Sequence, residues 1–426
     1  MTRPACASAA LFATTALALA SPALAVEESE VMSTYADIAA AAYGDSLTTA
    51  QTLREAIDAF VDAPSAEGLQ AARGAWLAAR VPYQQTEAFR FANPAVDDWE
   101  GRVNAWPLDE GLIDYVSADG SAPAEGTDEN PAAGLNVIAN PTFTLSGEQI
   151  DASDITPELL AGTLHEAGGA EANVATGYHA IEFLLWGQDL GAYDPGAGER
   201  PWTDFASGDA CTGGNCDRRG AYLTAAADLL VSDLEEMAAS WSEGGAARED
   251  ALADEAGVTR ILTGMGSLSY GELAGERMQL GLLLNDPEEE HSCFSDNTQN
   301  DHFYDALGIR NVWTGRYVGV DGAVVEGPSP ADLVAESDPA VADALSDALD
   351  ATQARMTEMK LAADAGLKYD MMLDPSREAG GALVQSAVDA LVAQTREIER
   401  AVAALGLDAI EIEGSDSLDS PDAVFQ

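Results

Sequence analysis

The sequence predicts an all-α protein. Alanine and leucine dominate it, and its apolar residues recur every three or four positions, which is the spacing of a helix face rather than of a strand. Two segments also begin with residues that start helices. Pro64-Ser65 precedes one of them, and Thr156-Pro157-Glu158 opens the other with a proline in the first turn.

The helical spacing places the expected elements in order along the chain. Long helices are expected at 31–61, 66–92, 157–186, 219–242, 248–283, 330–361 and 377–405, with a shorter one near 107–116. Three polar stretches interrupt them, at 117–150, 187–217 and 284–329. Loops of this length in a compact domain are usually functional. The acidic tail 414–426 is expected to fray.

Residues 1–25 have the organisation of an export signal. Arg3 supplies a positive charge, an apolar run extends from Ala9 to Ala20, and Ala23-Leu24-Ala25 is a small-residue cleavage site. Cleavage near Ala25 would release a periplasmic or secreted protein. The apolar run is too short to span a bilayer, and no later stretch is long enough, so we expect no transmembrane segment in the mature chain.

The remaining chain is long enough for about two domains. We expect an N-terminal helical bundle at 26–215 and a C-terminal helical bundle at 216–413, because each half contains several long helices. This layout suggests a duplication, although no repeat is visible at the level of single residues.

The charge of the chain excludes one class of partner. The formal net charge is −53 at pH 7, so the surface repels nucleic acid. Adaptation to salt explains most of this charge, and acidity alone is therefore weak evidence for metal binding. Cys211 and Cys216 flank a short loop and could form a disulfide in an oxidising compartment, which leaves Cys293 as a buried free thiol.

His179 and Glu182 are the first candidate site residues. They lie three positions apart in an apolar segment, so on a helix an imidazole and a carboxylate point the same way. They would be metal ligands, or else a core histidine hydrogen-bonded to a nearby glutamate. Two ligands do not complete an iron or zinc site, so further ligands must come from elsewhere in the chain.

Glu110, Asp114, Arg90 and Trp106 form a second set. Glu110 and Asp114 are four residues apart and share a helical face, so both could supply carboxylate ligands. Arg90 lies between two phenylalanines, where it would orient a carboxylate or an anion, or form an internal ion pair. Trp106 belongs to the segment Asn104–Glu110, which leads into the two carboxylates.

Two further segments carry candidates. Ser267, Glu272 and Arg277 lie in a stretch with small residues at 266, 271 and 275, and Glu272 and Arg277 would face a shared cavity or form surface charge pairs. Glu290 and His291 lie in an acidic loop that continues to Asp301 and His302. Carboxylates mixed with imidazoles suit iron, while solvation of an acidic protein explains the same loop.

These segments together resemble the imelysin family, also called the insulin-cleaving membrane protease family, in its iron-regulated protein A-like branch. The family motif Gly-x-His-x-x-Glu is matched by Gly177, His179 and Glu182, and the continuation Phe183–Gly187 is similar too. The stretches 104–110, 265–278 and 289–298 also look like this branch. The resemblance implies two helical bundles related by duplication, the motif in the cleft between them, export, and a link to iron uptake.

We therefore expect an exported protein that binds iron in an interdomain cleft and serves iron uptake, with an inner- or outer-membrane iron transporter as its partner. Carboxylates with one imidazole suit iron better than copper, and zinc or another divalent metal is the alternative. The expected ligands are His179, Glu182, Glu110 and Asp114. The expected supporting residues of the cleft are Arg90, Trp106, Ser267, Glu272, Arg277, Glu290 and His291.

Two other functions stay open. The family has been classified as metallopeptidases, and Glu182 could be the general base beside a metal-bound water. The sequence lacks the His-Glu-x-x-His helix of zinc proteases, so we do not expect catalysis. The third interpretation is a metal-free cleft for a siderophore or haem. No Cys-x-x-Cys-His motif supports haem attachment, which leaves His179 as the candidate axial ligand.

Overall fold

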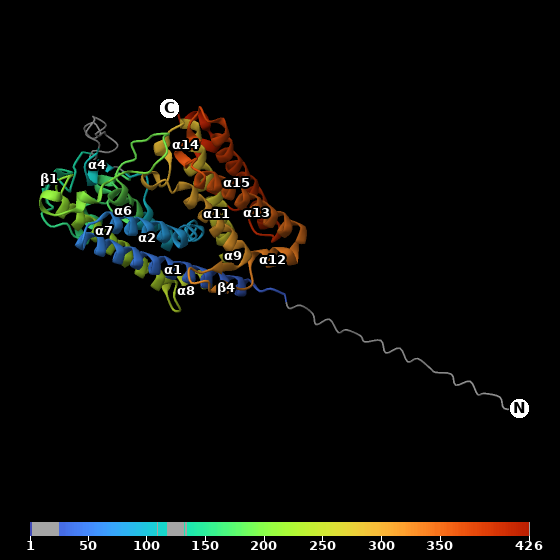
Figure 1. Ribbon diagram of the computed structural model, residues 1–426. Helices are drawn as coiled ribbons and strands as arrows, with labels where there is room; N and C mark the ends of the chain where they lie inside the picture. Colours follow the sequence, from blue (N-terminus) through green and yellow to red (C-terminus); the bar gives the residue numbers. More distant parts are fainter. Residues whose placement is uncertain (2–24, 109, 117–131, 133, 426) are drawn as a thin grey trace.

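The computed structural model describes residues 1, 25–108, 110–116, 132 and 134–425, and these residues are mostly helical, as the sequence predicts (Figure 1). The expected export signal lies outside the described residues except at its two ends. Within the described part of the chain, no helix combines the length and the hydropathy that crossing a bilayer requires.

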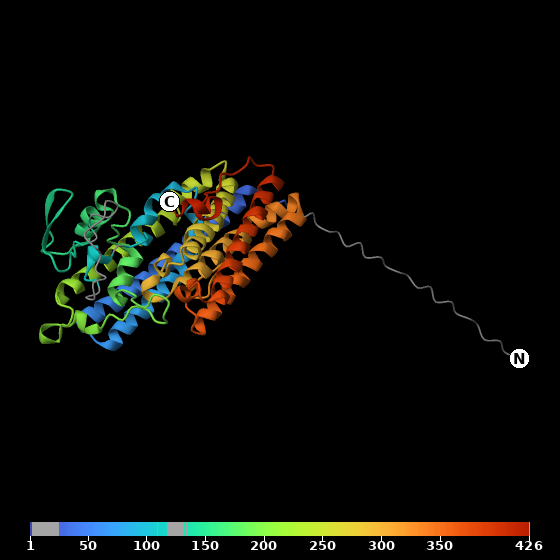
Figure 2. The same ribbon diagram turned by 90° about the horizontal axis from the view of Figure 1, so that it is seen from above.

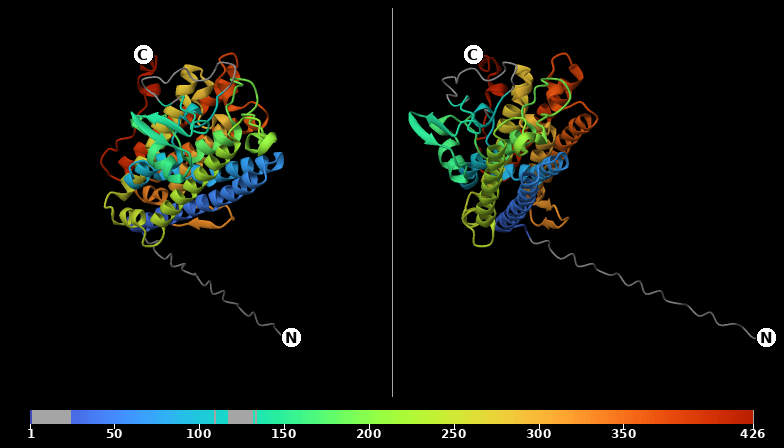
Figure 3. Two further views of the ribbon diagram at one scale, coloured as in Figure 1. Left: turned by 90° about the vertical axis from the view of Figure 1, so that its left-hand side faces the viewer. Right: turned by 60° about the vertical axis from the view of Figure 1, so that its left-hand side comes forward.

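One group of helices surrounds α1. It consists of α1 (Glu28–Asp62), α2 (Ala66–Gln84), α6 (Gly177–Trp186), α7 (Cys216–Trp241) and α8 (Ala246–Ala253). Both α2 and α7 pack along α1, and α6 packs against α2 and α7 (Figure 3). The apolar stripe of α1, which includes Val31, Tyr35 and Ile38, is buried by these neighbours, as the helical spacing predicts.

A second group of helices lies alongside the first (Figure 2). It consists of α9 (Gly257–Ser267), the π-helical segment η6 (Leu268–Gln279), α11 (Thr298–Thr314), α12 (Pro330–Ser337), α13 (Pro339–Asp364) and α15 (Glu378–Ala404). α15 packs against α13 and η6, and α11 packs against α13. α11 also packs against α2 of the first group, which joins the two groups at the middle of the molecule.

Shorter elements connect these helices. The described part of the chain contains two antiparallel hairpins, β1 (Thr142–Leu145) with β2 (Glu148–Asp151), and β3 (Arg316–Val318) with β4 (Val324–Glu326), the second of which lies against α1. The short helices are α3 (Pro94–Asn104), α4 (Glu110–Ile113), α5 (Pro157–Leu159), α10 (Leu280–Leu284), α14 (Tyr369–Leu373) and α16 (Asp416–Asp419). The remaining single turns are η1 (Glu87–Phe89), η2 (Leu160–Leu164), η3 (Ala167–Gly169), η4 (Trp202–Phe205), η5 (Gly208–Ala210), η7 (Pro287–Glu289), η8 (Cys293–Ser295) and η9 (Pro421–Ala423).

The boundary between two bundles at residue 215 stays a prediction. It falls just before α7, which packs along α1 in the first group of helices. One continuous cluster of buried apolar side chains extends from Val31 in α1 to Val402 in α15. A smaller cluster, which includes Met356 and Leu391, lies between η6, α13, α14 and α15.

Several expected helices are shorter or interrupted. The helix expected at 66–92 ends at Gln84, and the one expected at 157–186 is broken where Glu166 takes a left-handed backbone conformation (φ 51°). The helix expected at 248–283 is divided into α8, α9, η6 and α10, and that at 330–361 is divided at Asp338, which caps α13.

Two expectations about irregular segments are corrected. The polar stretch 284–329 contains a whole helix, α11. The tail does not fray over residues 414–425, because it forms α16 and packs on η6, where Ser417 Oγ donates to the Gly275 carbonyl (2.9 Å).

Candidate functional site

The N-terminus of α6 is fixed by a glycine. Gly177 has φ +78°, in the left-handed region, and a Cβ atom at this position would lie 2.4 Å from the Val103 carbonyl oxygen. No other residue fits there, because the conformation favours glycine and the backbone of α3 fills the space. Gly177 therefore lets α6 begin directly against α3, and this contact sets the position of His179 and Glu182.

His179 and Glu182 contact each other inside the protein. The His179 Nδ1 atom lies 2.9 Å from Glu182 Oε2, and the two side chains are 1% and 0% exposed. The other oxygen, Glu182 Oε1, accepts hydrogen bonds from the backbone N–H (3.0 Å) and the hydroxyl (2.6 Å) of Ser295. His179 Nε2 has no hydrogen-bond partner among the described residues. A carboxylate on one imidazole nitrogen, with the other nitrogen left for a ligand, is the usual arrangement of metal-binding histidines.

A second buried histidine contacts His179. The ring centroids of His179 and His291 lie 4.7 Å apart in an edge-to-face arrangement. His291 Nδ1 lies 3.0 Å from Asp301 Oδ2, so this imidazole also has a carboxylate on its Nδ1. Asp301 in turn forms a buried ion pair with Arg80 of α2 (3.2 Å), whose Nη1 donates to Asn104 Oδ1 (2.7 Å). The site thus combines residues of both groups of helices.

Burial keeps both imidazoles neutral at neutral pH. It lowers the pKa of His179 well below its usual value, with a further contribution from His291, and it lowers the pKa of His291 to about 3. Burial also raises the pKa of Glu182 to about 8. Burial would also raise the pKa of Asp301, but the Arg80 guanidinium and His291 outweigh burial and hold the pKa of this carboxyl group below its usual range. Neutral imidazoles are the form that binds metals.

A cavity of about 360 Å³ opens beside His291. Its polar lining includes Glu110, Glu288 and the free thiol of Cys293, which is half-buried rather than fully buried as expected. Trp106 forms another wall, with its indole N–H donating to the Glu290 carbonyl (3.1 Å) and its ring 5.7 Å from that of His291. Nitrogen, oxygen and sulfur donors therefore surround one cavity.

Arg90, Glu272 and Arg277 belong to an internal ion-pair network. Arg277 contacts Glu272 (2.6 Å), Glu87 (2.9 Å) and Asp305 (3.1 Å), and Arg90 lies 3.7 Å from Glu272. Burial raises the pKa of Glu272, but Arg277 and Arg90 outweigh this and lower it overall. These residues are thus ion-pair partners inside the protein.

Four other expected residues lie in structural contacts. Asp114 accepts from Arg200 (Oδ2, 2.6 Å) and, through both oxygens, from Arg219 (2.6 and 3.0 Å), so its carboxylate is saturated by two guanidinium groups. Ser267 Oγ accepts from the Glu413 backbone N–H (3.1 Å). Cys211 and Cys216 form a disulfide next to the start of α7.

The structure also brings residues to the site that the sequence did not single out. Arg80 contacts His291 and Ser295 contacts Glu182, while Asn104 accepts a hydrogen bond from Arg80. Of these three residues, only Arg80 could have been recognised from the sequence. It lies four residues after Trp76 and three before Tyr83, on the buried face of α2, where a charged side chain needs a partner.

Solved structures share this fold. A putative iron-regulated protein A precursor from Parabacteroides distasonis superposes with a TM-score of 0.62 at 18% identity, covering 90% of this chain and 97% of that one. An imelysin-like protein from Psychrobacter arcticum superposes with a TM-score of 0.59 at 20% identity, covering 92% and 100%. The chain therefore has the fold of imelysin-like proteins.

The sequence comparisons assign the family. The imelysin family model matches residues 39–398, which is most of the chain. Iron-regulated protein A from Synechococcus elongatus is 32% identical over 117 residues, which are 26% of this chain and 32% of that protein. The match thus spans about a third of that relative's length. The chain belongs to the imelysin family, as the Gly177-x-His179-x-x-Glu182 motif indicates.

Proposed function

We propose that this chain is an exported iron-binding protein that serves iron uptake, and that the iron site is built on the His179–His291 pair. The names of two similar proteins, both called iron-regulated protein A, support the link to iron. One of them is described as a precursor, which agrees with the export signal at residues 1–25.

One observation carries the proposal. His179 Nε2 is buried without a partner among the described residues, although its Nδ1 is anchored by Glu182. An imidazole nitrogen in this situation costs free energy unless it binds something. A neutral imidazole whose Nδ1 is held by the Glu182 carboxyl group offers Nε2 as a ligand atom, and metal cations are the usual partners of such a nitrogen.

The cavity supplies the further donors that an iron ion needs. His291 contacts both His179 and the cavity, and Glu110 lies on the cavity wall. Two imidazoles and a carboxylate are a donor set that Fe(II) accepts. We propose that a small rotation of the His291 ring brings His179 Nε2, His291 and Glu110 to one ion. Asp114 and Glu182 were expected ligands, but we do not propose them here. Both oxygens of Asp114 already accept from arginines, and Glu182 anchors His179.

A cleft between the two groups of helices is part of the proposal. Arg80 on α2, His179 on α6 and Asp301 on α11 come from different groups, so a change in their packing would open or close the site. The duplication of the two bundles stays a prediction.

Peptidase activity is the less favoured alternative. A general base must have an oxygen free to accept a proton from the metal-bound water. The Oε2 atom of Glu182 contacts His179, and its Oε1 atom accepts two hydrogen bonds from Ser295. We therefore assign Glu182 an anchoring role.

Calorimetric titration with Fe(II) under anaerobic conditions tests the proposal. The wild type should bind iron stoichiometrically, and His179→Ala and His291→Ala should each lose this binding. The matched control is His165→Ala, because His165 lies outside the site, where its Nδ1 accepts from the Ala175 backbone N–H (3.3 Å). Unchanged iron binding by His179→Ala, with helicity retained, would refute the assignment.

A further inference from the structure

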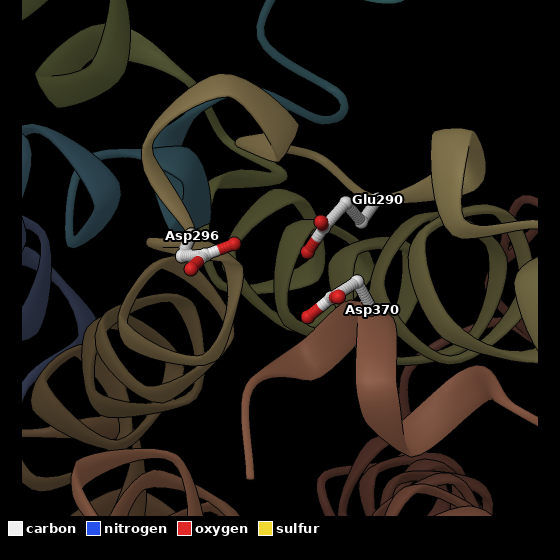
Figure 4. Close-up of side chains that lie close together, drawn as sticks. All are labelled: Glu290, Asp296 and Asp370. Atoms are coloured by element: carbon white, nitrogen blue, oxygen red, sulfur yellow. The ribbon is translucent and has the colours of Figure 1, made fainter. Parts of the chain in front are cut away.

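Three buried carboxylates meet on the far side of the segment that carries His291. Glu290, Asp296 and Asp370 each offer an oxygen, and these oxygens all lie within 4.8 Å of one another. The residues come from three places, the end of η7, the turn after η8, and α14 (Figure 4). The Glu290 and Asp370 carboxylates face each other, and the Asp296 carboxylate points toward them.

The hydrogen bonds of the protein do not satisfy these groups. Asp370 is 1% exposed, and neither of its carboxylate oxygens has a hydrogen-bond partner among the described residues. The same holds for Glu290 Oε2 and Asp296 Oδ1, in side chains that are 1% and 5% exposed. Buried polar atoms in folded proteins nearly always have partners, and ions are among those partners.

The protein's own cations do not neutralise the group. Lys368 lowers the pKa of Asp296 and Arg377 lowers that of Asp370, but burial and like charges outweigh both and raise the two pKa values overall. Arg377 is already paired with Asp374 (3.3 Å). Asp189 adds further negative charge to all three carboxylates. Several like charges held together in a buried place are unfavourable, and a bound cation would remove that cost.

We infer that Glu290, Asp296 and Asp370 form a binding site for a hard divalent cation, with Ca²⁺ as the expected ion. Two ligands on opposite sides of a calcium ion lie about 4.6–5.2 Å apart, so oxygens within 4.8 Å of one another are spaced as the ligands of one ion are. An all-oxygen donor set selects Ca²⁺, Mg²⁺ or Mn²⁺ over softer metals. Ca²⁺ is favoured among these ions, because it accepts irregular ligand geometry and the three ligands come from separate segments.

This site is separate from the proposed iron site and does not depend on it. The two sites share the segment after η7, in which the side chain of Glu290 faces the three-carboxylate site and His291 faces His179. A cation bound by Glu290 would hold this segment, and with it His291, in place. Iron binding should then be tighter when Ca²⁺ is present, and the coupling must be reciprocal.

Calcium titration calorimetry at about 0.15 M salt tests the inference, because salt screens weak binding to the acidic surface. Wild type should bind one Ca²⁺ with a Kd on the order of 10⁻⁴ M, as in extracellular calcium sites. Asp370→Asn should weaken binding by at least about tenfold, because it removes a ligand charge, and even the loss of a partner behind a ligand costs about 10–100-fold. The matched control is Asp347→Asn, an exposed carboxylate on α13, which should bind as wild type does.

Two readouts separate this inference from its alternatives. Without calcium, Asp370→Asn should melt no lower than wild type, since it removes repulsion; a lower melting temperature would mean a structural role and overturn the inference. Equal calcium affinity in Asp370→Asn and wild type would overturn it as well. His179→Ala should keep calcium binding and lose iron. If Asp370→Asn lost iron binding while His179→Ala kept it, the proposed iron site would be wrong instead.

Discussion

Replacing Asp301 with alanine should destabilise the protein more than almost any other single removal of a charge. The Asp301 carboxylate is fully buried and accepts from Arg80 (3.2 Å), His291 Nδ1 (3.0 Å) and Asn297 Nδ2 (3.0 Å), as well as from the Ser292 hydroxyl. Removing one partner of a buried ion pair leaves the other charge uncompensated, which costs about 3–5 kcal/mol. We expect a loss in this range for Asp301→Ala, because Arg80 is only 1% exposed.

Urea denaturation, followed by circular dichroism and by tryptophan fluorescence, measures this loss. The matched control is Asp350→Ala, which removes an ion pair with Arg310 (2.8 Å) whose side chains are 62% and 39% exposed. Exposed pairs contribute about 0–1 kcal/mol, so the control should change little. A loss for Asp301→Ala within about 1 kcal/mol of the control would refute the idea that this ion pair anchors the site.

Three further predictions concern the surroundings of the site. Gly177→Ala should lower the free energy of unfolding by at least about 1–3 kcal/mol, because it places a Cβ in a left-handed conformation against Val103; an unchanged urea midpoint would contradict the tight start of α6. Asp114→Ala should lower the free energy of unfolding by about 3–5 kcal/mol, because it leaves two buried arginines without their partner. Iron affinity measured by calorimetry should stay unchanged, because Asp114 is not a proposed ligand. Burial raises the pKa of Asp370 to about 7 and that of Asp296 to about 6, above their unfolded values. Without calcium, the protein should therefore become less stable as the pH rises from about 4 to about 7, because the unfolded chain loses these protons first. Calcium should therefore raise the melting temperature more at pH 8 than at pH 5, and an equal shift at both would contradict this.

Helices with an apolar buried face could be predicted from the sequence. α1, α7 and α15 begin and end within a few residues of the expected positions, because their stripes of buried apolar residues repeat every three or four positions. α11 was missed for the opposite reason. Its buried face carries Asp301, His302, Asp305 and Asn311, so a helix that packs around charged groups looks like a polar loop in the sequence.

The breaks inside the expected helices were also not predictable from spacing. The helical spacing on either side of residues 165–176 was joined into one expected helix at 157–186, while in the structure η2 ends at Leu164, followed by an extended His165 and a left-handed Glu166. The π-helical segment η6 was included in one expected helix, because no proline in its sequence marks the change from i→i+4 to i→i+5 hydrogen bonds.

The candidate site could be predicted only where its residues are close in sequence. His179 and Glu182 lie three positions apart, and the structure brings them into contact as this spacing indicates. Arg80 and Asp301 lie 221 positions apart, so no local pattern connects them. The mixed composition around His291 indicated a site, but only the fold shows that Glu290 and His291 point to different ones.

An anomalous difference map at the iron absorption edge, from crystals grown anaerobically with Fe(II), tests the central claim most directly. We predict a peak roughly 2 Å from His179 Nε2, with His291 and Glu110 as further ligands, since metal–imidazole bonds have about this length. A peak at Glu290, Asp296 and Asp370 instead, or no peak near His179 in protein that binds iron in solution, would contradict the claim.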